Sequence, residues 1–158
     1  MVHRGIATLA GLTMCCYILL SHFDPDFFFL HLYQSLIYLV IILMLFYFED
    51  HFAYMLGMLA PTASLIMMFA LGLIGAGLRQ VWWVFSPPYA GHKADPVALM
   101  AALTTLMALL MIGFCAYRWK REYAGVGKGL STFLISLAVI LVYDGVLIYW
   151  FTRSIGSR

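Results

Sequence analysis

Charged residues are scarce in this chain. They make up 10% of its 158 residues, whereas 65% are hydrophobic, and an average soluble domain carries about 25% charged residues. The few charges nearly balance, at +2, and no basic patch with interleaved aromatic residues occurs. The sequence therefore predicts an integral membrane protein of one domain, residues 1–158, with the lipid bilayer and not nucleic acid as its partner.

Recognisable catalytic motifs are also lacking. The three cysteines lie in apolar runs and form no C-x-x-C, so a thiol-redox enzyme is not indicated. The sequence contains no G-x-S-x-G, no P-loop and no dinucleotide-binding fingerprint. No catalytic residue and no cofactor can be assigned from motifs, and an enzyme is the less favoured interpretation.

Long apolar runs, by contrast, are abundant. Five of them predict an all-α bundle of five transmembrane helices with short loops. The third run would be roughly 40 Å long at about 1.5 Å per residue, which exceeds a ~30 Å hydrocarbon core. Pro61 is expected to end an interfacial first part of this run or to kink it. Pro96 would open the fourth run. The expected helices cover residues 5–23, 27–48, 52–78, 97–117 and 130–151.

The positions of lysine and arginine suggest an orientation. A compact basic cluster lies between residues 118 and 128, and such loops resist translocation. With five spans this cluster and the N-terminus share the inner side. We therefore expect a bacterial inner-membrane protein with its N-terminus inside and its C-terminus outside.

A polar stripe marks the second run. His31, Gln34, Ser35 and Tyr38 recur at i, i+3, i+4 and i+7 in a segment without charge, glycine or alanine, so they share one helix face. Such a face in lipid should contact protein, water or a ligand. The stripe predicts one wall of a polar site, or hydrogen bonds to a neighbouring helix.

An acidic residue within an apolar run is the second unusual feature. Asp144 lies about 10 Å inward from Phe151 at ~1.5 Å per residue, and an acid at a helix centre costs about 2.5–3.5 kcal/mol on insertion scales. Asp144 would lie near the interface, pair with Arg79, or act as a proton carrier or ligand. Together with the stripe, Asp144 and Arg79 complete the predicted intramembrane polar site.

A metal site is an alternative on the outer side. Imidazole and carboxylate groups there suit Zn, Cu, Fe or Ni, although their spacing matches no specific motif, and interfacial hydrogen bonding would explain the same residues. A haem between His22 and His31 is a weaker variant. The candidate ligands are His22, Asp24, Asp26, His31, His92 and Asp95.

Residues 79–95 are expected to form an aromatic loop at the headgroup level. Its interface residues are Trp82, Trp83, Phe85 and Tyr89. Gly72 with Ala76, and Ala98 with Ala102, are small-xxx-small pairs that predict close packing of the third and fourth helices.

Three functions remain open from the sequence. We favour a non-catalytic subunit of a larger membrane complex, of respiratory, photosynthetic or monooxygenase type, which would have other membrane subunits as partners. The alternatives are a metal- or quinone-dependent redox protein that uses the outer His/Asp group, and a small proton-coupled transporter that uses Asp144, His31 and Arg79.

Overall fold

The protein is built from helices, as a computed structural model shows for residues 2–47, 50–86, 95–123, 127 and 129–156. Five of the described helices are long and apolar enough to cross a membrane, which confirms an all-helical fold with five such helices. One more α-helix among the described residues, α4, is shorter than these five. The elements are α1 Val2–Phe23, the 3₁₀ turn η1 Pro25–Phe27, α2 Phe28–Tyr47, α3 Asp50–Ala70, α4 Leu73–Phe85, α5 Pro96–Tyr123 and α6 Gly129–Gly156.

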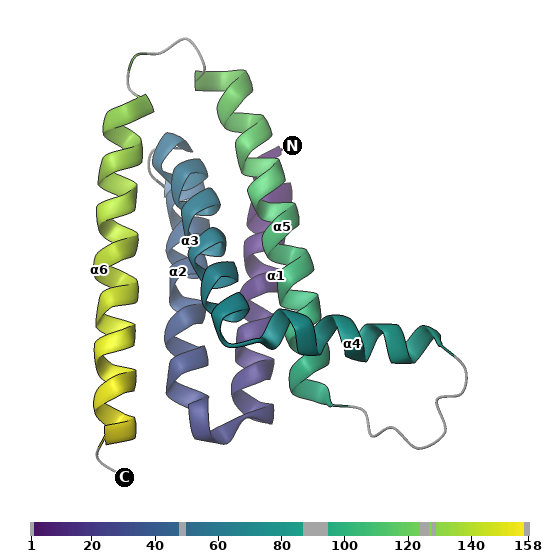
Figure 1. Ribbon diagram of the computed structural model, residues 1–158. Helices are drawn as coiled ribbons and strands as arrows, with labels where there is room; N and C mark the ends of the chain where they lie inside the picture. The colour runs from purple at the N-terminus through teal and green to yellow at the C-terminus, as the bar shows by residue number, and fades with distance from the viewer. Residues whose placement is uncertain (1, 48–49, 87–94, 124–126, 128, 157–158) are drawn as a thin grey trace.

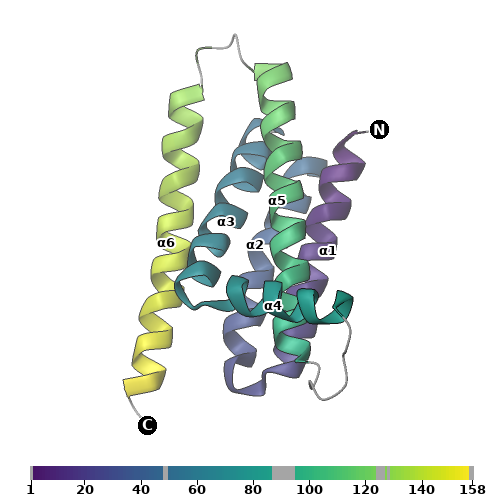
Figure 2. The ribbon, with the colours of Figure 1, turned by 45° about the vertical axis from the view of Figure 1, so that its right-hand side comes forward.

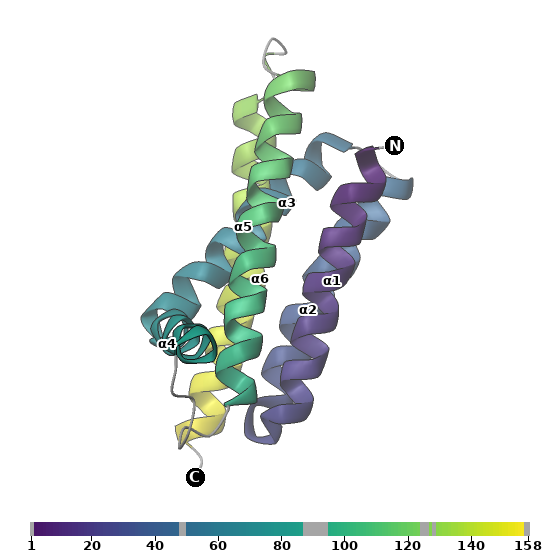
Figure 3. The same ribbon diagram turned by 90° about the vertical axis from the view of Figure 1, so that its right-hand side faces the viewer.

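The long helices form two layers. In Figure 1 the front layer holds α6, α3 and α5, and α2 and α1 lie behind it; Figure 3 shows the two layers from the side. Although α5 and α6 are consecutive, α3 stands between them and packs against both (Figure 2). The N-terminus and the C-terminus lie at opposite ends of the bundle, as an odd number of long helices requires.

The third apolar run breaks at a glycine. α3 ends at Ala70 and α4 begins at Leu73, so the expectation of one helix over residues 52–78 is wrong. The chain turns at Gly72, whose φ of 71° is left-handed and suits glycine because it has no Cβ. Pro61 lies inside α3 without ending it; proline is tolerated in apolar helices where neighbouring groups compensate for the lost hydrogen bond.

Helix α4 lies across the bundle at the end where the C-terminus is found (Figure 1). It packs on α5, and Gly77 is the contact residue. A Cβ added there would lie 3.0 Å from the Ala98 carbonyl oxygen and 3.1 Å from the Ala102 amide nitrogen. The expected close packing on Ala98 and Ala102 is confirmed for Gly77, whereas a Cβ at the predicted Gly72 would meet nothing within 4 Å.

The ends of α5 and α6 differ from expectation mainly on their C-terminal sides. α5 begins at Pro96 and continues to Tyr123, and α6 continues to Gly156. Asp95 accepts backbone hydrogen bonds from Val97 (2.9 Å) and Ala98 (3.3 Å), which satisfies amides left free in the first turn. The Asp95-Pro96 pair thus sets the start of α5.

The buried core is small and lies between the layers. α1 and α2 meet through stacked rings of Tyr17 and Tyr38, with centroids 5.7 Å apart. α3 approaches α5 closely where Gly57 faces Cys115 and Met111. Large apolar side chains are exposed along α1, α2, α5 and α6 and near the C-terminal end of α3, as expected of helices surrounded by hydrocarbon.

Candidate functional site

The polar stripe of α2 faces the interior of the bundle. His31, Ser35 and Tyr38 are buried, with exposed fractions of 7%, 2% and 0%, and Gln34 is half-buried. Ser35 donates to the Leu32 carbonyl of its own helix at 2.7 Å, which satisfies it locally. The other three side chains point toward neighbouring helices.

Tyr38 belongs to a group of hydroxyls in the centre of the bundle. Its oxygen lies 3.5 Å from that of Ser64 on α3. Tyr17 of α1 lies close to both, but its buried hydroxyl has no hydrogen-bond partner among the described residues. Part of the stripe therefore does bond to a neighbouring helix, and the Tyr17 hydroxyl lies beside the same pair.

His31 lies close to Asp24, which is in the turn between α1 and α2. Its Nε2 lies 3.6 Å from Oδ2 of Asp24, a separation that permits ionic attraction but is too long for a hydrogen bond. Both ring nitrogens are buried and lack a hydrogen-bond partner within the described part of the chain. A buried imidazole without hydrogen bonds costs free energy unless another group forms hydrogen bonds with its nitrogens.

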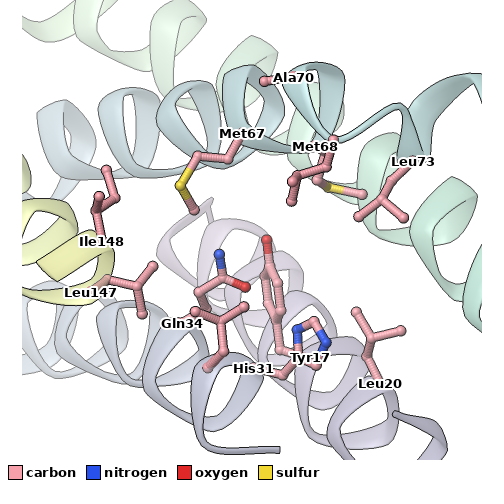
Figure 4. A pocket seen from close by; sticks show the side chains of 12 residues that line it. Tyr17, Leu20, His31, Gln34, Met67, Met68, Ala70, Leu73, Leu147 and Ile148 are labelled. Carbon is pink, nitrogen blue, oxygen red and sulfur yellow. The ribbon is translucent and has the colours of Figure 1, made fainter. Parts of the chain in front are cut away.

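A cavity of about 220 Å³ lies beside these groups, where α1, α2, α3, α4 and α6 meet. Figure 4 shows Tyr17, His31 and Gln34 directed toward it from α1 and α2, with Met67 and Met68 of α3 on the opposite wall. Its other lining residues are apolar, apart from backbone groups: Leu20, Leu30, Ala70, Leu71, Leu73, Leu147 and Ile148.

Asp144 lies on α6, outside the lining of this cavity. It is half-buried and close enough to act electrostatically on Tyr17, Tyr33 and Tyr38. Next to it, Tyr143 stacks on Tyr33 with centroids 4.4 Å apart, and its hydroxyl donates to the Tyr33 carbonyl. Asp144 itself makes no hydrogen bond or ion pair with a described side chain.

Arg79 does not join Asp144. It is exposed on α4, and its Nε donates to the Gly75 carbonyl oxygen at 3.4 Å. The pairing considered from the sequence is therefore not formed, because the break at Gly72 carries Arg79 away along α4. Of the rest of the predicted polar site, the stripe residues lie on the inner face of α2, and Asp144 lies half-buried on α6.

The candidate metal ligands are brought together only as the pair His31 and Asp24. His22 is exposed, and Asp95 caps α5. The side chain of Asp26 and all of His92 lie outside the described residues. Within the described residues, no three His, Cys, Asp or Glu side chains are grouped closely enough to hold a metal.

The expected aromatic loop begins as a helix. Trp82, Trp83 and Phe85 belong to α4 and are exposed by 70%, 37% and 80%, so the expectation that residues 79–85 form a loop is wrong. Tyr89 lies outside the described residues. Exposed aromatic rings on a helix that crosses the bundle axis suit the interface between lipid and water.

Tyr17 is the site residue that sequence reasoning missed. A signal was present, because Thr13, Tyr17 and Ser21 recur at i, i+4 and i+8 along the first apolar run, and all three are buried. The polar stripe of the second run is the more conspicuous of the two signals.

Comparisons of this chain with protein-family models, with curated proteins and with solved structures give no match. The functional argument therefore depends on the described residues themselves.

Proposed function

We propose that this is an integral membrane protein that crosses a bacterial inner membrane five times, with its N-terminus inside. The five apolar helices and their apolar outer surface support the crossings. The basic end of α5, with Arg118 paired to Glu122 at 3.0 Å, supports the orientation. α4 would then lie along the outer surface with its tryptophans at the headgroups.

We further propose that it is a non-catalytic subunit of a larger membrane complex. The observation that carries this proposal is Asp144 on α6. α6 is the least covered of the five long helices, since 22% of its span is buried compared with 44% in α3. An acidic side chain without an ion-pair or hydrogen-bond partner among the described residues therefore lies on the helix that its own chain covers least.

The energetic argument concerns the cost of leaving such an acid unpaired. Insertion scales assign about 2.5–3.5 kcal/mol to a central acidic residue, and such residues pair with one another or line a pathway. The described part of this chain offers Asp144 tyrosines but no cation. A lysine, arginine or hydrogen-bond donor on a neighbouring subunit would supply the missing partner and fix the docking position.

The test is purification from the native membrane in a mild detergent. We expect the tagged protein to migrate on a native gel with other subunits, which mass spectrometry would identify. Asp144→Asn, which removes the charge and keeps the size, should reduce the recovered partner at least tenfold. Val139→Asn is the matched control, because Val139 is exposed on the same helix and carries no charge to lose.

Two results would contradict the proposal. In the first, the wild-type protein migrates alone or only with copies of itself. In the second, Asp144→Asn and Val139→Asn retain the same amount of partner, which would show that Asp144 does not contribute to the contact.

A further inference from the structure

The cavity beside His31 offers almost no polar group to a ligand. Tyr17, His31 and Gln34 are the polar side chains among the described residues that line it. The Tyr17 hydroxyl and both His31 ring nitrogens are buried, so these two residues present ring carbons to the cavity. No charged side chain in the described part of the protein lines it. Apart from the Gln34 amide, nothing is available to hold a polar or charged head group.

Water does not suit such a space either. A buried water molecule makes about three hydrogen bonds, and apolar cavities of similar size stay dry. One side-chain amide does not supply that many partners. An empty cavity is unfavourable as well, because the side chains around it lose dispersion contacts on one side. Hydrocarbon restores those contacts and needs no hydrogen bonds.

The cavity opens toward the surroundings of the bundle. Leu71 and Ile148 line it and are also 64% and 52% exposed. Its α2 lining runs from Leu30 to Gln34, which lies about 3–9 Å inward from the start of α2 at ~1.5 Å per residue. In the proposed orientation this depth is just below the outer head groups, where the acyl chains of the membrane begin.

The size of the cavity selects a segment of one chain. An apolar cavity of about 150 Å³ takes up benzene, and pockets for drug-sized ligands begin at about 300 Å³. At about 220 Å³, this cavity admits part of an acyl chain but not a whole lipid. Met67 and Met68 form the wall opposite α1 and α2 (Figure 4), and their unbranched side chains adapt to an irregular neighbour.

We propose that this cavity binds one acyl chain of an outer-leaflet phospholipid. The chain enters beside Leu71 and Ile148 and packs against Leu20, Met67 and Met68, while the head group stays at the membrane surface. The proposal rests on the proposed crossing of the membrane. It is independent of the role of Asp144 and of any partner subunit.

The test uses the full chain in phosphatidylcholine nanodiscs, in which part of the lipid carries a photoactivated diazirine midway along one acyl chain. Illumination attaches the lipid to the residues that this chain touches, and mass spectrometry of peptides locates them. Lipid around the protein reaches exposed residues such as Val142, which is 68% exposed. A chain inside the cavity also reaches buried residues.

Two matched pairs of buried residues separate the cavity from the rest of the interior. Met68 lines the cavity and Met55 does not, although both lie on α3 and are 6% exposed. Leu20 in the cavity and Leu56 outside it are each 4% exposed. We expect at least about tenfold more lipid on the cavity member of each pair, because a close-packed interior admits no chain. Lipid in both leaflets carries the probe, so residues near the inner surface are sampled too.

A filled cavity supplies a second comparison. Leu20→Trp places a larger apolar side chain in the cavity and should reduce the lipid on Met68 to the level found on Met55. The lipid on Val142 should stay unchanged. Thermal unfolding of the variant would be measured in parallel to show that it is folded, and the comparison within the wild-type protein does not depend on it.

Three outcomes would overturn the proposal. The first is equal labelling within both pairs while Val142 is labelled, which would show a protein that crosses the membrane but keeps lipid out of the cavity. The second is undiminished labelling of Met68 in folded Leu20→Trp, which would show that lipid reaches Met68 by another route. The third is the absence of label from Val142 as well, which would contradict the membrane crossing itself.

Discussion

The contact between α4 and α5 allows a sharp test of the packing. Gly77→Ala would place a Cβ 3.0 Å from the Ala98 carbonyl oxygen and 3.1 Å from both the amide nitrogen and the Cβ of Ala102. These neighbours are backbone atoms or the first side-chain atom of a residue in α5, so they cannot rotate away. The methyl group fits only if α4 shifts from its position.

The expected magnitude is a difference between two opposing effects. Replacing glycine by alanine within a helix gains about 0.5–1 kcal/mol, while overpacking costs typically about 1–3 kcal/mol. Gly75→Ala is the matched control, because Gly75 lies on the same helix and a Cβ there meets nothing within 4 Å. Gly75→Ala should therefore stabilise the protein slightly, and Gly77→Ala should destabilise it relative to this control by about 1–3 kcal/mol.

Thermal unfolding in detergent measures this difference. For a chain of this length each kcal/mol corresponds to a Tm shift of roughly 2–4 °C, so Gly77→Ala should unfold several degrees below Gly75→Ala. Equal Tm values for the two variants would refute the reasoning. They would mean that α4 does not pack on Ala98 and Ala102.

Two further predictions concern α5. Gly57→Ala would place a Cβ 2.6 Å from the Cys115 sulfur and should lower the free energy of unfolding by about 1–3 kcal/mol. Adding Cys115→Ala to this variant should restore part of the lost stability. If the two substitutions were strictly additive in a double-mutant cycle, the contact would be contradicted. Asp95→Ala should cost about 0.5–2 kcal/mol through loss of the cap, whereas Asp95→Asn should cost far less. Chemical denaturation would compare the two, and equal losses would argue against a capping role.

Short-range signals predicted much of the fold. Apolar runs of membrane-spanning length identified the five long helices, and the Asp95-Pro96 pair predicted the start of α5 because cap chemistry is local. The burial of His31, Ser35 and Tyr38 followed from their spacing, since a polar stripe on an apolar helix is stabilised by facing protein.

The break in the third run could not be located in the same way. Both Pro61 and Gly72 are helix-breaking residues by type, and which of them acts depends on the surrounding contacts. The helical hydrogen-bond loss at Pro61 is tolerated inside the bundle, while Gly72 adopts a left-handed φ that lets α4 turn onto α5. That choice depends on the fit of Gly77 to α5, which is a long-range contact.

The candidate site, like the fold, could be predicted only as far as local sequence signals reach. The sequence identified His31 and Gln34, but the cavity beside them exists only because side chains from several helices leave a space. The separation of Arg79 from Asp144 likewise follows from the turn at Gly72 and not from any local pattern. Their grouping was inferred from depth along the helices, which gives no information about direction around the bundle.

The left-handed turn at Gly72 also makes the cavity depend on a residue that does not line it. Met67, Met68, Ala70, Leu71 and Leu73, all within five positions of this glycine, form one wall. The position of this wall thus depends on the backbone angle at Gly72 as well as on the lining side chains. A lineage could lose the cavity through one substitution at Gly72 while every lining residue stays the same.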